Sequence, residues 1–382
     1  MHSTPPSHQR QSVSRPYRRS PGGLLLPLHA TLAGRVRWQV LDERGVPEVP
    51  RTPSGIPVGP VEGVEQPNLI TDQGMNDLAV RSCLIFTTGA TWRGHLAVGT
   101  GSTAPAVSDT TLDNEVQRAT TSGASPNGSR EFELDTGTNQ WRATSLATRL
   151  VTMTADRNLT EFGFAPGASD DINIRELIRD GGGTPITVSL LNGKTLRVDH
   201  TLTLEMPAPA AGHAVSIDVE EYDAGNNLTA TLPYDVIHGG LARDTEAWPD
   251  PMEWVWHAWD PTSLSPQTDT ATLRRITGDI AYARTGMLGT SDQEPSATGS
   301  GIVDFVLATY AAGSFQRVKR ATVASAAQDV AWQGYQFSWR RSGANTVARL
   351  GGWVVMLDDP KTYTKANTDT LRVGFVGTWA RA

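Results

Sequence analysis

Residues 195–206 alternate strictly between apolar and polar side chains, and this pattern fixes their secondary structure. A period of two places every second side chain on the same face of a β-strand, whereas a helix would scatter the same residues around its axis. We therefore predict a strand with one face in a hydrophobic core and the other in water. The apolar face carries Leu196, Val198, His200, Leu202, Leu204 and Met206, and the polar face carries Thr195, Arg197, Asp199, Thr201, Thr203 and Glu205.

The same alternation recurs near both ends of the chain. Val36, Trp38 and Val40 alternate with polar neighbours, and residues 371–379 repeat the pattern. The 382 residues include 37 glycines and 24 prolines, and only 19% are charged, a composition typical of proteins with many turns. Cys83 is the single cysteine, so a disulfide framework or a thiolate metal site is excluded. We expect an all-β protein held together by packing, strand pairing and subunit association.

Two proline-rich stretches predict the domain organisation. Residues 45–67 hold six prolines, and Pro207-Ala208-Pro209-Ala210 forms a second, shorter stretch. Thr195-Leu196-Arg197-Val198 and Thr370-Leu371-Arg372-Val373 are identical, and each opens the last predicted strand of its region. We therefore predict tandem antiparallel β-sandwich modules, jelly-roll-like in type. The predicted segments are an extended basic arm (1–34), a strand with a proline-rich linker (35–67), a first module (68–207) and a second module (211–382).

Three local patterns predict details of the first module. Asn192-Gly193 between residues 186–191 and 194–206 is typical of a two-residue turn, so we expect these two segments to form a hairpin. Residues 68–79 predict a short strand followed by a brief helix that Asp72 caps. A further strand is expected at 95–98, followed by a loop at 99–105.

The N-terminal segment is basic although the whole chain is acidic. Residues 1–20 contain Arg10, Arg15, Arg18 and Arg19 and no acid. Because the whole chain carries a net charge of −7, the other 362 residues carry −11. An isolated arm of this composition is expected to be disordered, so we interpret it as a segment that a partner orders through its carboxylates. The alternative, a secretory signal, is disfavoured because Pro27 and His29 interrupt the apolar run after Arg19.

Motifs of known catalytic sites find little support. Gly99-x-Gly101-x-x-Ala104 follows a predicted strand as in dinucleotide sites, but Pro105 prevents the helix that such a site needs. His200 has no acid or nucleophile beside it, so we interpret it as a core-edge histidine. We expect no enzyme activity, no catalytic residue, no metal and no cofactor. A depolymerase stays open as an alternative, because sequence spacing does not reveal a pair of carboxylates.

Residues 244–260 are rich in tryptophan and acids. Trp248, Trp254, Trp256 and Trp259 place four of the 11 tryptophans within 12 residues. Such a segment is typical of an interface anchor or of a loop packed over a sandwich end. It also fits contact with a glycan, in which indoles stack on sugar rings and acids bind hydroxyls. Glu253 and His257 would share a metal only if the segment were helical.

Short motifs along residues 35–382 resemble those of minor structural proteins of tailed-bacteriophage virions. The matching residues are Asn68-Leu69-Ile70-Thr71 with Gly74, Val98-Gly99-Thr100-Gly101 with Pro105 and Asp109, Arg175 to Asp180 with Thr187-Val188, Asp359-Pro360-Lys361 with Thr368, and Leu371 to Trp379. The resemblance implies a tail, baseplate, collar or fibre component that is assembled in the host cytoplasm. It carries no catalytic residues.

The expected function is therefore that of a structural subunit in the tail region of the virion. Its partners would be other tail or neck proteins, further copies of the chain as a homo-oligomer, and a tail fibre. The alternative is a receptor-binding tail protein that recognises a host surface glycan through the tryptophan-rich segment. The net negative charge disfavours nucleic acid as a partner, and no apolar run of about 20 residues predicts insertion into a membrane.

Overall fold

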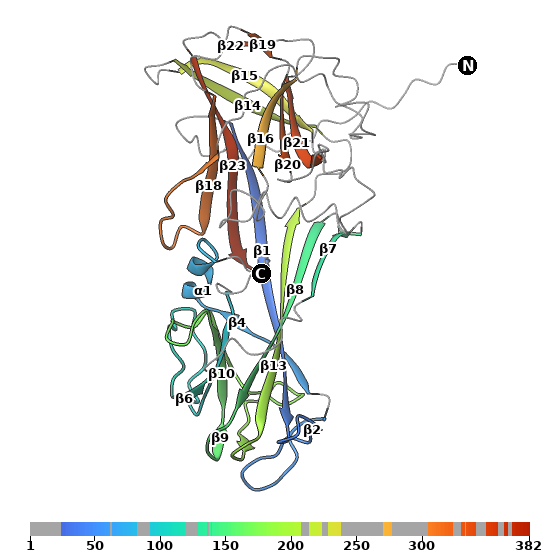
Figure 1. Ribbon diagram of the computed structural model, residues 1–382, viewed down its shortest axis with the longest axis vertical. Coiled ribbons are helices and arrows are strands. Elements are labelled where there is room, and N and C mark those ends of the chain that lie inside the picture. Colours follow the sequence, from blue (N-terminus) through green and yellow to red (C-terminus); the bar gives the residue numbers. More distant parts are fainter. Residues whose placement is uncertain are drawn as a thin grey trace, which may run out of the picture.

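The computed structural model shows an elongated molecule built almost entirely of β-strands (Figure 1). In the part of the chain that the structure describes, the single helix is the short α1 (Asp72–Asp77), which confirms the all-β class. The described residues are 24–61, 63–81, 92–119, 129–135, 137–138, 140–207, 214–223, 228–237, 270–276, 305–323, 330–332, 334–340, 349–357, 363–365 and 369–382.

The largest sheet has 14 strands. Its main path runs through β16 (Thr270–Ile276), β20 (Gly334–Arg340), β21 (Arg349–Leu357), β15 (Leu228–Ile237), β14 (Ala214–Asp223), β23 (Asp369–Arg381), β1 (Leu24–Leu41), β13 (Thr195–Pro207), β8 (Gln140–Thr152) and β7 (Arg130–Asp135). The strands off this path are β17 (Phe305–Leu307), β18 (Gln316–Val323), β2 (Pro47–Glu48) and β3 (Val64–Pro67).

Three smaller sheets complete the described structure. The five-stranded sheet has the order β4 (Leu69–Ile70), β11 (Ile174–Leu177), β10 (Glu161–Ala165), β5 (His95–Gly99) and β6 (Glu115–Arg118). The two-stranded sheets pair β12 (Val188–Leu190) with β9 (Arg157–Leu159), and β19 (Val330–Trp332) with β22 (Tyr363–Lys365).

Strand β1 joins the two ends of the molecule. Its residues Thr31–Leu41 pair antiparallel with β13, and its residues Leu24–Leu32 pair in parallel with β23. The parallel pair departs from the purely antiparallel architecture predicted from the sequence. It is possible because β1 and β23 lie near opposite ends of the chain, and parallel neighbours need a long connection. The identical segments 195–198 and 370–373 thus open two strands that flank β1.

The sheet is continuous across the predicted module boundary, because β1 bonds to strands on either side of residues 207–211. Residues 24–34, assigned from the sequence to the arm, form the first half of β1. The predicted linker contributes β2 and β3, which pair with the edge of β1 opposite β13. The arm outside the described residues is therefore 1–23, while the division into two modules stays a prediction.

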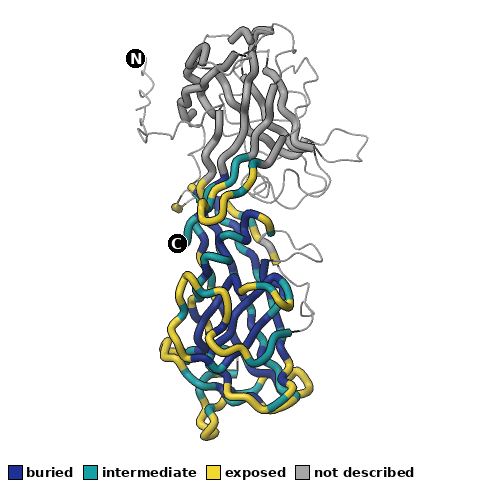
Figure 2. Tube along the Cα trace, turned by 90° about the vertical axis from the view of Figure 1, so that its left-hand side faces the viewer, coloured by how far each residue is buried: buried dark blue, intermediate teal, exposed yellow. Residues whose placement is uncertain are grey.

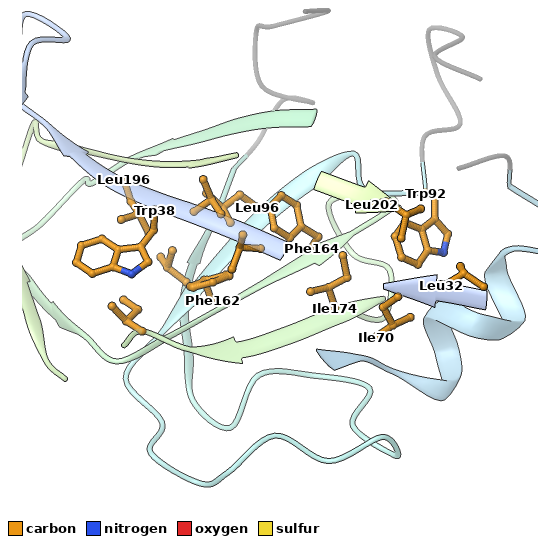
Figure 3. Close-up of a cluster of buried hydrophobic side chains, with 14 of the residues drawn as sticks. Leu32, Trp38, Ile70, Trp92, Leu96, Phe162, Phe164, Ile174, Leu196 and Leu202 are labelled. Atoms are coloured by element: carbon orange, nitrogen blue, oxygen red, sulfur yellow. The ribbon is translucent and has the colours of Figure 1, made fainter. Parts of the chain in front are cut away.

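The core lies between the large sheet and the five-stranded sheet. The predicted apolar face of β13 is buried along its whole length, and Val36, Trp38 and Val40 of β1 are buried beside it. Phe162 and Phe164 of β10 reach the same cluster from the facing sheet (Figure 3). Figure 2 shows the buried trace inside this end of the molecule and the exposed turns around it. The alternation in the sequence therefore identified the core faces of both strands.

The predicted hairpin at 186–206 is wrong, although its turn forms. Gly193 has a φ of 87°, and the amide of Lys194 donates to the carbonyl of Leu191 over 3.1 Å. However, β12 pairs with β9, whereas β13 pairs with β8 and β1. The turn therefore leads the chain from the β12–β9 sheet into the large sheet.

The predicted helix cap is also wrong by one residue. Thr71 is the N-cap of α1, and its hydroxyl accepts from the amide of Gly74 over 3.0 Å and donates to the carbonyl of Ile172 over 2.8 Å. Asp72 instead lies in the first helical turn, where its carboxylate pairs with Arg381. The hydroxyl of Thr71 is preferred because it satisfies an orphan helix donor and a buried carbonyl together.

Helix α1 forms a junction with the C-terminal end of β23 and the turn before β18. The indole of Trp379 is buried and donates to the carbonyl of Met75 over 2.8 Å. Its ring stacks on that of Tyr310, whose hydroxyl donates to Asn76 over 2.8 Å. The amide of Gly313 donates to the same Asn76 oxygen over 2.7 Å. These contacts fasten the β18–β23 region to the strands that surround α1.

We expect Trp379→Ala to lower the free energy of unfolding by about 3–5 kcal/mol, because it leaves a cavity at the junction and an unpaired carbonyl at Met75. Trp379→Phe, which keeps most of the packing and loses only the hydrogen bond, should cost about 1–2 kcal/mol. Urea titration followed by circular dichroism measures both changes. Equal stability of the alanine variant and the unchanged protein would contradict this account of the junction.

Candidate functional site

The arginines and tryptophans predicted as contact residues lie outside the described residues. This applies to Arg10, Arg15, Arg18 and Arg19 of the arm and to Trp248, Trp254, Trp256 and Trp259 of the tryptophan-rich segment. Glu253 and His257 lie outside them as well. The described structure therefore does not test whether these residues lie close together, and their roles stay predictions.

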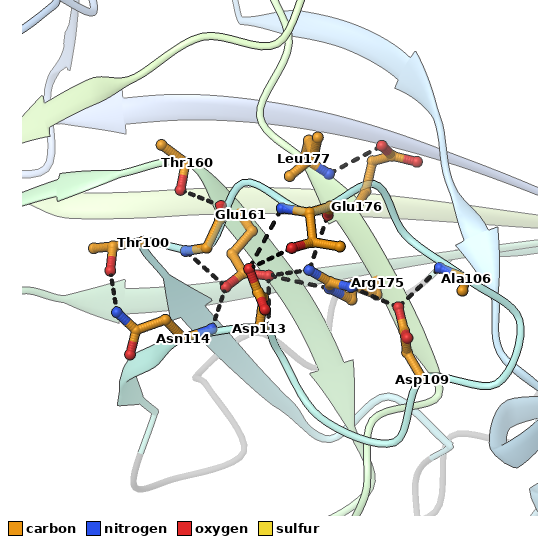
Figure 4. Close-up of polar contacts among 12 residues, drawn as sticks. Thr100, Ala106, Asp109, Asp113, Asn114, Thr160, Glu161, Arg175, Glu176 and Leu177 are labelled. Carbon is orange, nitrogen blue, oxygen red and sulfur yellow. Dashed lines mark hydrogen bonds and ion pairs between the residues drawn. The ribbon is translucent and has the colours of Figure 1, made fainter.

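Within the described part, the most closely connected polar cluster is centred on Glu161 (Figure 4). Glu161 of β10 is fully buried, and its carboxylate bonds to the guanidinium of Arg175 on β11 over 2.9 and 3.0 Å. Arg175 is 3% exposed and also bonds to Asp109 over 2.6 Å. The two strands are neighbours in the five-stranded sheet, so strand pairing brings the two buried charges together.

The same carboxylate holds the loop that runs from β5 to β6. Glu161 accepts hydrogen bonds from the backbone amides of Gly101, Asp113 and Asn114 over 3.0, 3.1 and 2.8 Å. A Cβ atom at Gly101 would lie 2.4 Å from Oε1 of Glu161, so only glycine fits there. The loop thus closes around an anion that the protein itself supplies.

This arrangement tests whether the glycine pattern at 99–104 forms a dinucleotide site. No helix follows β5 in the described residues, and the amide of Gly101 already bonds to Glu161. A phosphate at this position would displace a buried carboxylate and leave Asp109 as the only described carboxylate bonded to Arg175. The interpretation of these glycines as a strand-to-loop turn is therefore confirmed. The Thr103 hydroxyl and amide hold the pKa of Asp113 below its ordinary value, which further ties the loop together.

A second buried cluster surrounds His200 in the core. Arg93 is 2% exposed, and its guanidinium bonds to Nδ1 of His200 and, over 3.0 Å, to the carbonyls of His200 and Ser145. A guanidinium only donates, so Nδ1 accepts and the imidazole proton sits on Nε2. That Nε2 atom has no hydrogen-bond partner within the described part. The rings of Trp92 and Phe164 lie at 6.3 and 5.5 Å from the imidazole.

These surroundings keep His200 neutral. Burial, together with the positive charge of Arg93, holds the pKa of His200 well below its ordinary value of 6.5. A proton on the imidazole would add a second positive charge inside the core. The site is enclosed by side chains and offers no exposed nucleophile or base. It therefore supports packing of the sheet and not proton transfer to a ligand.

Two further carboxyl groups have a raised pKa, and both are held by neighbouring side chains. Burial raises the pKa of Asp77, which accepts a hydrogen bond from Asn173 over 3.0 Å. Burial also raises the pKa of Glu176, which pairs with Arg179 over 3.2 Å. Among the described residues, no group of three or more histidine, cysteine or acidic side chains is arranged to hold a metal ion. No described helix is long and apolar enough to cross a membrane.

Sequence reasoning missed Glu161, Arg175 and Arg93 as partners in buried polar clusters. The available signal was a charged residue inside a short apolar strand, as in Glu161-Phe162-Gly163-Phe164-Ala165. A charge in such a position is rarely buried unless it is paired. The partner, however, lies on another strand, and its identity follows only from the register between β10 and β11.

We expect Glu161→Gln to lower the free energy of unfolding by about 3–5 kcal/mol, because it leaves the buried guanidinium of Arg175 partly uncompensated. The control Glu65→Gln removes an exposed ion pair with Arg35 and should cost less than about 1 kcal/mol. Chemical denaturation of both variants measures the difference. Equal losses would show that the cluster does not hold the loop.

Stability should fall as the pH drops below 6.5, with a contribution from His200. Below this pH the unfolded chain binds a proton at His200 and the folded chain does not, so acid favours unfolding by about 1.4 kcal/mol per pH unit until the folded pKa is reached. Above pH 6.5 this group contributes no slope. Denaturation at a series of pH values should show a smaller slope in His200→Gln, whereas His29→Gln, an exposed control, should keep the original slope. An unchanged slope in His200→Gln would contradict the prediction.

The chain was also compared with known proteins. No protein-family model, no curated protein and no solved structure matches it.

Proposed function

We propose that the protein is a structural subunit of the tail region of a tailed-phage virion and has no catalytic role. The observation that carries this proposal is the continuity of the large sheet, in which β1 bonds to β13 at one end of the molecule and to β23 at the other. An elongated body whose two ends share a strand transmits force without a flexible linker. Such a body suits a subunit that must keep a fixed length between neighbours in an assembly.

The buried polar groups support the same proposal. Glu161 and Arg175 hold a loop, and Arg93 bonds to the neutral His200 in the core, so these polar groups serve the fold. The junction around Trp379 fastens the C-terminal end of β23 to α1. In the proposed architecture these parts belong to tandem, jelly-roll-like β-sandwich modules, of which the two facing sheets around Trp38 and Phe162 form the first.

Residues 1–23 would supply the contact with neighbours. The chain enters β1 at Leu24, so the four arginines before it are covalently attached to the sheet that holds the molecule together. We take the neighbours to be further copies of the chain and other tail, baseplate or collar proteins, including a fibre. The virion would be assembled in the host cytoplasm. The alternative, glycan recognition through the tryptophan-rich segment, rests on composition alone, because that segment lies outside the described residues.

We expect deletion of residues 2–20 to leave a soluble, folded protein that no longer enters particles, because β1 begins only at Leu24. The matched variant Arg10→Gln, Arg15→Gln, Arg18→Gln, Arg19→Gln keeps the length of the arm and should show the same loss. Thermal unfolding tests the fold, and immunoblots of purified particles from cells that lack the natural copy test incorporation. Normal incorporation of the deletion variant would overturn the docking role of the arm.

A further inference from the structure

Strand β7 ends one side of the large sheet (Figure 1). It pairs with β8 over Arg130–Asp135, and no described strand pairs with its other side. An edge strand presents a row of backbone donors and acceptors that another extended segment can complete.

Acidic side chains line one face of this edge. Glu131, Glu133 and Asp135 occupy alternate positions of β7, so they share a face, and Glu205 of β13 reaches the same group through Arg142 of β8. Arg142 bonds to Glu133 over 2.9 Å, to Asp135 over 3.2 Å and to Glu205 over 3.0 Å. One guanidinium therefore pairs with three carboxylates, and together with Glu131 the group has a net charge of −3. Glu131 is exposed and has no ion pair within the described part.

The arm contains one segment suited to this edge. Residues 7–15 form its longest run without proline, so every residue in the run keeps a backbone N–H to donate. Arg10 and Val13 are three positions apart and therefore lie on opposite faces of a strand. With Arg10 on the acidic face, Val13 lies on the face of Phe132, which packs against the core.

We propose that residues 7–15 of one copy of the chain form an added strand in a neighbouring copy, on the side of β7 that pairs with no described strand. Arg10 then meets the carboxylates of Glu131 and Glu133, and the remaining arginines of the arm add long-range attraction to the acidic body. This inference rests on the proposed function and names the surface on which the arm docks.

Three other strands that end described sheets, β16, β6 and β4, fit the arm less well. Strand β16 carries Arg274 and Arg275, which have the same sign of charge as the arm. In β6, Glu115 is already paired with Arg118 over 2.7 Å. The remaining edge strand of the five-stranded sheet, β4, has two residues. Of these four strands, β7 alone combines six residues with an acidic face.

The geometry favours a neighbouring copy over the same chain. Strand β1 lies three strands away from β7 in the sheet, and Leu24 lies about five residues along β1 from the level of Asp135, the end of β7. Leu24 and that end of β7 are therefore roughly 20–25 Å apart. Residues 16–23 span at most about 27 Å when fully extended. To reach β7 of the same chain they would have to reverse direction at the start of β1 and run almost straight. A neighbouring copy removes both requirements.

Cysteine cross-linking between two differently labelled copies tests the proposal. One copy carries Ser12→Cys and a heavy-isotope label, the other carries Glu131→Cys, and both carry Cys83→Ser. After mild oxidation we expect a disulfide-linked dimer that contains one copy of each kind. The control Glu65→Cys, an exposed acid on β3 away from this edge, should give none. A disulfide that forms only when Ser12→Cys and Glu131→Cys are placed in one chain would overturn the proposal, as would equal cross-linking to the control.

A second measurement separates strand pairing from charge. Ser12→Pro interrupts the pairing segment, whereas Ser3→Pro lies outside it and serves as the control. We expect Ser12→Pro to abolish self-association measured by light scattering, and Glu131→Gln with Glu133→Gln to weaken it about tenfold at low salt. Unchanged association of Ser12→Pro would overturn the proposal.

The outcomes distinguish this inference from the proposed function. If the arm deletion blocks entry into particles but no cross-link forms at β7, the arm docks elsewhere and only the inference fails. If the cross-link forms but the deletion variant enters particles normally, the edge contact exists and the proposed role of the arm in assembly fails.

Discussion

The pairing of β1 along both of its edges holds the rest of the structure in place. β13 lies on one edge, while β23, β3 and β2 follow one another along the other. The partners come from the beginning, middle and end of the chain, so strand β1 unites segments that are distant in sequence. Trp38 extends from it into the core, and its indole donates to the carbonyl of Arg179 over 3.1 Å. Removal of β1 would therefore divide the large sheet between β23 and β13 and also remove Trp38 from the core.

The sequence predicted those features that depend on local periodicity. The alternation in residues 195–206 identified the buried face of β13 correctly, and Val36, Trp38 and Val40 did the same for β1. The end of the arm was harder to place, because Pro27 is unfavourable within a sheet. In the structure it falls where β1 has a described neighbour only on the side of β23, and a strand with one open edge tolerates a missing donor.

Features that depend on distant partners could not be predicted. The turn at Gly193 is a local property and forms as expected, but nothing in residues 186–194 specifies that β12 pairs with β9. In the same way, the burial of Glu161 becomes favourable only through Arg175 and three backbone amides of another loop. The arginines and tryptophans selected as site residues lie outside the described part, so composition remains their only support.

The parallel pairing of β1 with β23 also constrains the order in which the chain can fold. Leu24 pairs with Val373, and Leu32 pairs with Arg381, so the only described strand that pairs with residues 24–30 of β1 comes from residues 373–381. The half that pairs with β13 can be completed much earlier. A nascent chain therefore carries an exposed strand edge for most of its synthesis, and such edges attract non-native pairing. Closure by β23 is a contact of very large sequence separation, which makes it a slow and late step in folding.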